Sequence, residues 1–405
     1  MSLDVVALRR EFPSLRSGIA HFDGPGGTQT PEVVAAAVAA VLTGPLSNRG
    51  RVVASEVNAD RAVAAFRQAY ADLLGVPAGG IVHGRSATQL TYDFSRALAK
   101  DWRVGDEVVV SRLDHDANVR PWVQAATAKG AEVRWIDFDP ATSELDLGSV
   151  EAVITPRTRL VAITAASNLI GTRPPVRAVA DVAHAAGALV YVDGVHYAAH
   201  QAVDVPALGA DLFVCSPYKF LGPHCGVLAA DPGLLETLRP DKLVPSTDAV
   251  PERFELGTLP YEVMAGATAA VDFLAGLAPG AGGDRRSRLR AAMHAVDEHE
   301  RRLLGMLEAG LAELGPAVVV HSRAAERTPT LLLTLPGRAT WDAYEFLARR
   351  DVLAPAGSFY AYEPFRRLGL DDPHGLRLGL APYTDDSDVA RVLDGLAALL
   401  KTASA

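Results

Sequence analysis

The chain has 405 residues, of which 49% are hydrophobic and 21% charged, a balance typical of a folded globular protein rather than a disordered one. At about 150 residues a domain, this length predicts two or three domains. The 39 Lys and Arg residues against 48 Asp and Glu residues give a net charge of −9, which argues against a surface built to neutralise nucleic-acid phosphates. We therefore expect no nucleic-acid partner.

Cysteine content and the N-terminal segment indicate the compartment. Cys215 and Cys225 are too few to form a disulfide framework in a chain of this size and fit a reducing environment. The opening stretch MSLDVVALRREFPSL mixes acids and arginines with apolar residues, unlike a secretory signal. No stretch reaches the roughly 18 uncharged apolar residues that a membrane-spanning helix needs. We expect a cytoplasmic protein with no membrane partner.

Short apolar runs alternate with Ala-rich helical segments, such as 177–186, over the first two thirds of the chain. The runs are apolar on both faces, a pattern that predicts an α/β architecture with a parallel sheet covered by helices on each side. The predicted strands are 107–111, 132–137, 160–164, 189–193, 212–215 and 227–230.

The Pro- and Gly-rich stretch APGAGG at 278–283 interrupts this pattern and predicts a domain boundary. Beyond it we expect a smaller α+β domain, with a charged amphipathic helix first and a final helix after Thr384. We assign residues 21–277 to a large domain and residues 1–20 and 278–405 to a small one. The elements predicted beyond the boundary are a helix at 285–314, a strand at 330–335 and a helix near 341–350.

Two charged residues follow neighbouring apolar strands. Asp193 ends the run LVYVD. Ligands of open α/β sheets bind outside the carboxyl ends of strands, so Asp193 is expected to face a ligand. The alternative is that Asp193 caps the N-terminus of a helix. Lys219 follows the run LFVC, and a lysine so close to buried strands usually has a partner or a role, the alternative being a surface lysine. Together they suit pyridoxal phosphate (PLP), in which a lysine forms a Schiff base and an acid keeps the pyridine nitrogen protonated.

The chain resembles the class V aminotransferases of PLP fold type I, and within them the cysteine desulfurase-like branch. The resemblance runs from HFDGPGGTQTPEVV and SNRGR near the N-terminus to GLRLGLAPYTDDSDV near the C-terminus. It implies a large domain with a mostly parallel seven-stranded sheet covered by helices, a smaller α+β C-terminal domain, and an amino-acid substrate.

The resemblance also implies cofactor contacts. VHGRSATQLTYDFSRAL resembles the phosphate loop of the family, so the backbone of Ser86 and Ala87 at a helix start would hold the phosphate. SRLDHDANVRPW resembles a segment of the family whose histidine stacks on the PLP ring, which implies this role for His115. The alternatives are that His115 belongs to a capped loop, or that it binds a metal together with Asp114 and Asp116.

Further segments imply substrate and subunit contacts. AASNLIGTRPPV places Asn168 near the ring oxygen and the substrate carboxylate, and Ser216 would contact the phosphate. FELGTLP resembles a segment whose threonine reaches the neighbouring subunit's phosphate, so Thr258 implies a homodimer with shared active sites. Arg377 would grip the substrate carboxylate with two parallel hydrogen bonds, or, alternatively, pair with a structural acid.

Three positions depart from the family pattern. His196 replaces the usual Gln and Tyr218 the usual His before the lysine, yet both can hydrogen-bond, His196 to the ring oxygen and Tyr218 to the phosphate. The third departure is a missing cysteine: the stretch APAGSFYAYEPFRRLG at 354–369, where desulfurases carry their persulfide-forming cysteine, has none. We expect Cys215 and Cys225 to be structural.

The same stretch offers aromatic side chains in place of the cysteine. Ser358, Phe359, Tyr360 and Tyr362 would form a pocket wall, with Tyr360 contacting substrate, unless these tyrosines pack between the domains.

We therefore expect a PLP-dependent enzyme with C–S or C–Se lyase or aminotransferase-type chemistry and no persulfide cysteine. The substrate amine would displace Lys219, Arg377 and Asn168 would hold the carboxylate, and the freed lysine would remove the α-proton. An amino-acid epimerase and a catalytically silent PLP-fold binding or regulatory protein are the alternatives, and no metal is expected. A nicotinamide site is disfavoured because DGPGGTQ lacks the third glycine of G-x-G-x-x-G.

Overall fold

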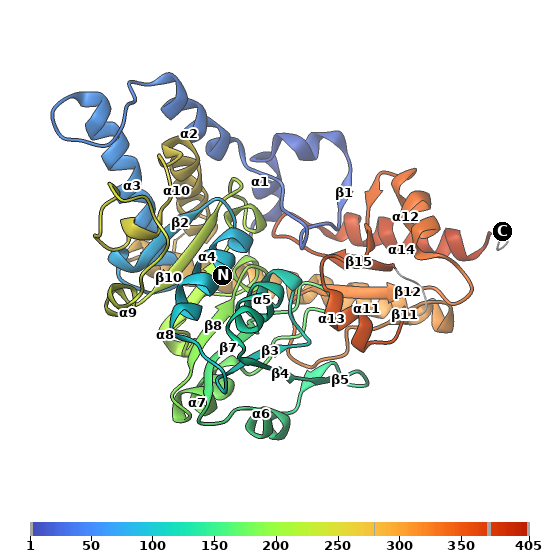
Figure 1. Ribbon diagram of the computed structural model, residues 1–405. Coiled ribbons are helices and arrows are strands. Elements are labelled where there is room, and N and C mark those ends of the chain that lie inside the picture. The colour runs from blue at the N-terminus through green and yellow to red at the C-terminus, as the bar shows by residue number, and fades with distance from the viewer. Residues whose placement is uncertain (1–2, 279, 371–373, 403–405) are drawn as a thin grey trace.

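A computed structural model describes residues 3–278, 280–370 and 374–402, so Pro279 of the predicted boundary lies outside the described residues. Its large domain is built on a seven-stranded sheet in the order β2-β10-β9-β8-β7-β3-β4 (Figure 1). Strand β10 runs antiparallel to β2 and β9, and all other neighbours are parallel. The strands are β2 (Ile81–Gly84), β3 (Glu107–Ser111), β4 (Glu132–Ile136), β7 (Thr158–Thr164), β8 (Leu189–Asp193), β9 (Leu212–Cys215) and β10 (Gly226–Ala230).

This sheet confirms the predicted α/β fold. Six of its strands agree with the predicted ranges to within two residues, whereas β2 was not predicted, because its apolar run is only Ile81 and Val82 before His83 and Gly84.

Helices bury both faces of the sheet, which is why its central strands are mostly apolar. Val109, Val161 and Val190 belong to one core, and Val108 and Val110 to the core on the other face. Burying such a side chain contributes about 1.5–3 kcal/mol relative to leaving it in water. The first core is closed by α3 (Ala54–Leu74), α7 (Val176–Ala185), α10 (Tyr261–Ala275) and the start of α11 (Arg285–Glu313), and the second by α4 (Ala87–Leu98) and α5 (Arg120–Lys129).

A smaller antiparallel sheet, in the order β11-β12-β15-β14, forms the C-terminal α+β domain and has a core of its own. Helix α11 joins the two domains, since Leu289 packs in the large core and Leu303 and Leu307 in the small one. The elements of this domain are β11 (Val319–Val320), β12 (Thr330–Thr334), α12 (Thr340–Ala348), β13 (Val352–Leu353), β14 (Ala356–Gly357), α13 (Tyr362–Arg367), β15 (Gly375–Gly379) and α14 (Asp386–Leu400).

The N-terminal segment contacts both domains. Leu8 and Phe12 pack in the large core, whereas β1 (Ala20–His21) pairs in parallel with β13. The domain limits given above stay a prediction. The remaining elements are α1 (Val5–Arg10), α2 (Glu32–Thr43), β5 (Phe138–Asp139), β6 (Glu144–Leu145), α6 (Leu147–Val153), α8 (Val205–Leu208) and α9 (Pro232–Thr237).

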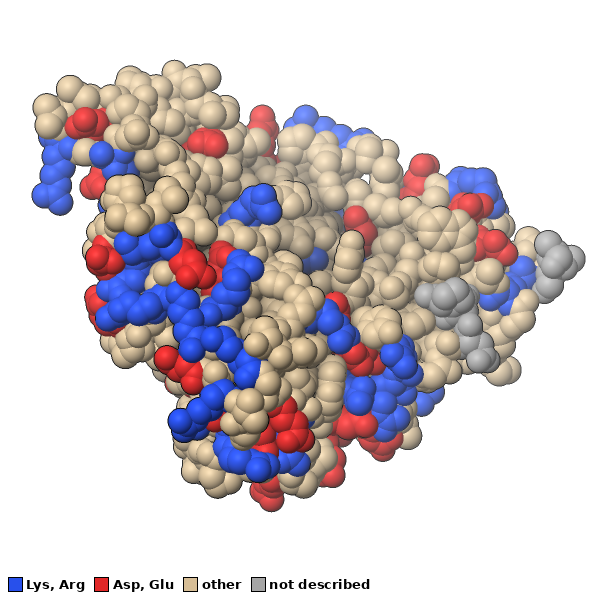
Figure 2. Space-filling view, viewed as in Figure 1, with Lys and Arg blue, Asp and Glu red and all other residues tan. Residues whose placement is uncertain are grey.

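The parallel register aligns the strand ends that carry the chemistry. Thr164 of β7 lies beside Asp193 of β8, and Asp193 beside Val214 of β9, so that Thr164 and Asp193 share the carboxyl end of the parallel strands. On the face in Figure 2, acidic and basic side chains are interspersed, and the basic ones gather over the large domain. Within the described ranges, no helix combines the length and apolarity needed to cross a membrane.

Candidate active site

A cavity of about 340 Å³ lies at these strand ends, between the two domains. The residues that line it include every predicted catalytic, cofactor-binding and substrate-binding residue except Thr258. These side chains come from seven separate segments of the chain. Apart from Asp193 and Lys219, the sequence related these residues to one another only by resemblance. Their individual roles stay predictions.

One wall of the cavity is the N-terminus of α4. Ser86 is its N-cap, and its hydroxyl accepts a hydrogen bond of 3.1 Å from the Gln89 N–H. The first N–H groups of a helix have no partner within the helix, so Ala87 and Thr88 present an anion-binding end to the cavity. Strand β10 approaches this turn so closely that a Cβ at Gly226 would lie 2.4 Å from the Ser86 carbonyl carbon.

Asp193 ends β8 and is 7% exposed. Its Oδ1 accepts a 2.8 Å hydrogen bond from the Val195 N–H. Burial raises the pKa of Asp193 to about 6, while this hydrogen bond and the charge of Lys219 lower it. An acid in this environment is stabilised as an anion when a cationic nitrogen binds beside it.

Lys219 lies in the short turn after β9. Its Nζ donates to the Pro25 carbonyl and is 4.8 Å from the centre of the Tyr218 ring. Burial and the nearby Arg377 lower the pKa of Lys219 to about 7, against the opposing effect of Asp193. A large share of this side chain is therefore a neutral, nucleophilic amine near pH 7.

His115 is held in one tautomer. Its Nδ1 accepts a 3.0 Å hydrogen bond from the Ala117 N–H, which leaves the ring proton on Nε2. Burial, with the charges of Lys219 and Arg377, lowers its pKa to about 4, so the ring is neutral at pH 7. The ring faces that of Tyr360, with centroids 5.7 Å apart and planes at 29°. A neutral imidazole in this setting suits stacking on an aromatic cofactor.

Arg377 is buried in β15 without a carboxylate partner. Its Nη1 donates to the Asn168 carbonyl at 2.9 Å, and its Cζ lies 3.8 Å from the centre of the Phe359 ring. No ion pair among the described residues includes Arg377, which disfavours the alternative of a structural pair. Burial lowers its pKa to about 9, against the opposing effect of Asp23.

Three buried polar atoms at this cavity have no hydrogen-bond partner among the described residues. They are Arg377 Nε, Asn168 Oδ1 and His196 Nδ1. Leaving such atoms unsatisfied is costly, so together they indicate a polar ligand. The amide of Asn168 is oriented by a 3.0 Å hydrogen bond from Nδ2 to the Phe359 carbonyl.

The two replaced positions also line the cavity. The Nε2 of His196 contacts the hydroxyls of Thr328 and Thr330 at 2.9 and 3.1 Å. Tyr218 stacks on His224 with ring centroids 4.6 Å apart, and Ser216 lies buried beside it.

Thr258 lies apart from the cavity and lines a second one of about 380 Å³ together with His224 and Cys225. The loop residue Tyr362 likewise lines a neighbouring groove, which shares Phe359 and Tyr360 with the main cavity.

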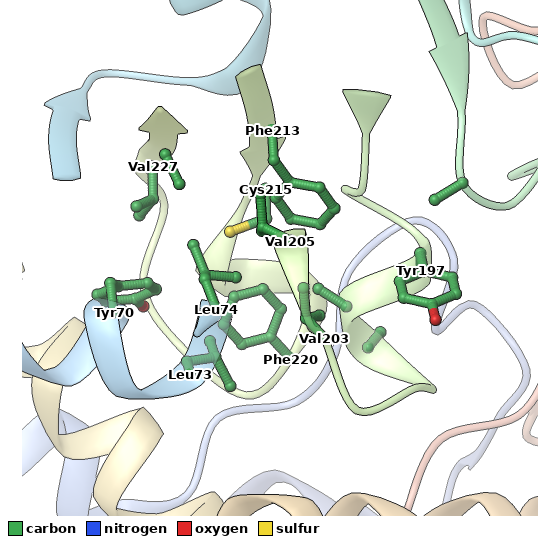
Figure 3. Close-up of a cluster of buried hydrophobic side chains, with 14 of the residues drawn as sticks. Tyr70, Leu73, Leu74, Tyr197, Val203, Val205, Phe213, Cys215, Phe220 and Val227 are labelled. Carbon is green, nitrogen blue, oxygen red and sulfur yellow. The ribbon is translucent and has the colours of Figure 1, made fainter. Parts of the chain in front are cut away.

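Both cysteines are free and buried. Burial raises the pKa of Cys225 to about 12 and that of Cys215 well above its ordinary value. Figure 3 shows the sulfur of Cys215 among hydrophobic side chains, near Phe213 and Phe220. Within the described ranges, no cluster of three His, Cys, Asp or Glu side chains could hold a metal ion.

Sequence reasoning missed several groups around the site. Pro25 carries the carbonyl that binds Lys219, and it lies in the DGPGG turn, whose glycines were a usable signal. Thr328 and Thr330 gave no signal, because threonines just before a strand or at its start are ordinary. His200 and Glu300, a buried pair behind His196, were also missed.

The aminotransferase class-V family model matches residues 20–392. The chain belongs to this family. Its cofactor is pyridoxal 5'-phosphate, and the anion-binding end of α4, Asp193, Lys219 and the three unsatisfied atoms fit that group.

Individual relatives cover nearly the whole chain. An uncharacterized protein of Mycobacterium tuberculosis is 31% identical over 404 residues, covering 98% of this chain and 100% of its own length. A probable cysteine desulfurase of Pseudomonas aeruginosa is 30% identical over 404 residues and 95% of each chain. Among solved structures, the cysteine desulfurase CsdA of Escherichia coli aligns with a TM-score of 0.86 at 27% identity, covering 99% of each chain.

The low pKa of Lys219 predicts a pH-dependent effect of Lys219→Met on the stability of the apoprotein. Between pH 7 and the ordinary lysine pKa of 10.5, the unfolded chain binds more protons than the folded one, so wild-type stability rises with pH. We expect Lys219→Met to be more stable by roughly 2–4 kcal/mol at pH 7 and below, with the difference shrinking as the pH rises. Urea unfolding measures this.

The control is Lys129→Met at an exposed lysine, which should show no such trend. A stability difference for Lys219→Met that stays constant with pH would mean that the lysine has its ordinary pKa.

Proposed function

We propose that the protein is a PLP-dependent enzyme that acts on an amino acid by C–S or C–Se lyase or aminotransferase-type chemistry, without a persulfide cysteine. The observation that carries the proposal is that Lys219 and Arg377 line the same cavity, and that the buried Arg377 has no carboxylate partner among the described residues. A protein that only bound PLP would have no need of a buried carboxylate clamp. Relatives named cysteine desulfurase and aminotransferase-like protein, the latter from Gibberella zeae, support this range of chemistry.

Bound PLP stabilises negative charge on the substrate α-carbon when a bond to that carbon breaks. Asp193 keeps the ring nitrogen protonated, and His115 covers the ring as a neutral imidazole. The N–H groups of Ala87 and Thr88, with the Ser216 hydroxyl, hold the phosphate.

Arg377 and Asn168 orient the substrate. The guanidinium, fixed by the Asn168 carbonyl and the Phe359 ring, keeps Nε free for a carboxylate oxygen. The Asn168 amide, held by the Phe359 carbonyl, lies next to it. With the carboxylate fixed, the neutral amine of Lys219 accepts the α-proton, and the Pro25 carbonyl holds the amine in place.

The stretch 354–369 supports the absence of a persulfide step. Phe359 and Tyr360 of this stretch line the cavity, and their carbonyls accept hydrogen bonds from Asn168 Nδ2 and from the Asp116 N–H. Cys215 and Cys225 are buried thiols with raised pKa values, which disfavours either as a sulfur nucleophile. Sulfur or selenium would therefore leave as a free product.

Arg377→Ala is expected to keep the visible absorption of bound PLP and to lose turnover of amino acids by about a hundredfold, since a charge-assisted pair of hydrogen bonds is removed. The matched control is the corresponding amine without a carboxylate, whose reaction should not depend on Arg377. Equal turnover of an amino acid by wild type and variant would contradict the clamp.

Mass spectrometry of products from a panel of amino acids, including cysteine and selenocysteine, tests the reaction type. Release of sulfide or selenide, or formation of an oxo acid, supports the proposal. An inverted amino acid identifies an epimerase instead, and no product with no α-proton exchange identifies a silent protein. Either result would contradict the proposed chemistry.

We further propose a cytoplasmic homodimer with shared active sites. Two segments of the chain carry exposed apolar side chains: Val52 is 89% exposed and Val244 is 97% exposed. The Arg49–Glu252 ion pair joins these two segments. Thr258 lies near the second of these segments, in a cavity of its own, as expected of a residue that serves a neighbouring subunit.

A charge within this apolar surface should break the dimer. Val52→Glu and Val244→Glu are expected to shift the sedimentation of the protein from dimer to monomer, because they bury an unpaired charge at the interface. Val104→Glu, at an 82% exposed valine before β3, is the control and should stay dimeric. A monomeric wild type would contradict the proposal.

A further inference from the structure

One threonine from the N-terminal part of the chain contacts the turn that carries Lys219. This Lys219 turn consists of residues 216–222, directly after β9. The hydroxyl of Thr28 binds it on both sides of the lysine. It donates to the Tyr218 carbonyl at 3.2 Å and accepts from the Leu221 N–H at 2.8 Å.

The backbone partners fix the direction of both hydrogen bonds. A carbonyl oxygen only accepts and an amide N–H only donates, so the hydroxyl proton of Thr28 points to Tyr218 and a lone pair faces Leu221. The backbone N–H of Thr28 donates to the same Tyr218 carbonyl at 2.9 Å. Thr28 thus makes three hydrogen bonds to the residues on either side of Lys219.

Leu221 is the residue of the turn that most needs this support. Its φ of 71° lies in the left-handed region, which is unfavourable for a residue with a side chain. The side chain itself is fully buried in the core of the large domain. A backbone conformation of this kind persists where the surrounding structure holds it, and the Thr28 hydroxyl accepts the Leu221 N–H at this point.

The segment that carries Thr28 is itself held by the small domain. Before Thr28, the Phe22 carbonyl accepts a 2.9 Å hydrogen bond from the Gly379 N–H of β15. After it, the Gln29 N–H donates to the Tyr383 hydroxyl at 3.0 Å. Thr28 therefore attaches the Lys219 turn to a segment that is fixed at both ends.

The position of the amine decides which charges act on it. Burial, and then the charge of Arg377, lower the pKa of Lys219 to about 7, and Asp193 opposes them. The rings of His115 and His196 line the same cavity and are neutral, and the ring centre of the preceding tyrosine lies 4.8 Å from Nζ. An amine that moved from this place towards water would regain part of its ordinary pKa.

We propose that Thr28 is a positioning residue for Lys219, which holds the Lys219 turn on both sides so that the amine stays at the Pro25 carbonyl. The inference rests on the proposed function for the role of Lys219 towards PLP. Thr28 is not among the residues that line the cavity, so it acts through the lysine. A group that already stands in the right place reacts faster than one that must first be brought there.

Competitive labelling of the apoprotein with acetic anhydride, followed by peptide mass spectrometry, measures the pKa of each lysine without the cofactor. Thr28→Val keeps the shape of the side chain and removes both hydrogen bonds of the hydroxyl. We expect the labelling midpoint of Lys219 to rise from about 7 by about one pH unit, because the freed amine reaches water. The other lysines should keep their midpoints, and Thr28→Ser, which retains the hydroxyl, should restore that of Lys219.

The rate at which PLP attaches gives a second measurement. In Thr28→Val the visible band of lysine-bound PLP should form about tenfold more slowly, and in Thr28→Ser at the wild-type rate. Thr155→Val is the matched control. The half-buried Thr155, just before β7 at the amino ends of the parallel strands, also donates to an acceptor, Glu107 Oε2, and accepts from a backbone N–H, that of Arg157. Its variant should leave the midpoint and the rate unchanged.

Thr28→Ala covers the case in which Thr28→Val does not fold. Its smaller side chain leaves room for a water to bind the Leu221 N–H, but a water does not fix the turn, so the same changes are expected. Wild-type values in the folded variant, equal changes in Thr155→Val, or no restoration by Thr28→Ser would overturn the proposal. Failure of the proposed function would appear separately, as a wild type that does not attach PLP at Lys219.

Discussion

The site depends on burying three charged side chains together without an ion pair between them. Asp193, Lys219 and Arg377 share one cavity, and burial moves the pKa of each towards neutrality, to about 6, 7 and 9. Such a group of side chains is unfavourable in an empty protein and becomes favourable when a ligand brings the missing charges. A ligand with a cationic nitrogen, a phosphate and a carboxylate would complement it.

Both domains contribute charged side chains to the cavity. The large sheet supplies Asp193 and Lys219 at neighbouring strand ends, and the small sheet supplies Arg377 from the middle of β15. Helix α11 is continuous through both cores, so it anchors the small domain to the large one. Its residue Glu300 pairs with His200, whose ring contacts that of His196 at the lining of the cavity.

Only two of the predicted site residues had a local signal of their own. Apolar strands followed by a polar residue pointed to Asp193 and Lys219, whereas Ser86, Ala87 and the other site residues were predicted from the resemblance to the family. Contacts across the chain gave no such signal. The stacking of Phe359 on Arg377 and the His200–Glu300 pair depend on folding, because each residue alone resembles an ordinary loop, strand or helix residue. The edge strand β2 was missed because its apolar run is too short to be distinctive.

Lys219 is the residue that we propose binds PLP covalently. Reduction of the PLP-loaded protein with borohydride, followed by digestion and peptide mass spectrometry, tests it directly, because reduction fixes the cofactor to the lysine that carries it. We expect one phosphopyridoxyl group per chain, on Lys219. Modification spread over the other lysines, or none at Lys219, would contradict it. Those other lysines are Lys100, Lys129, Lys242 and Lys401.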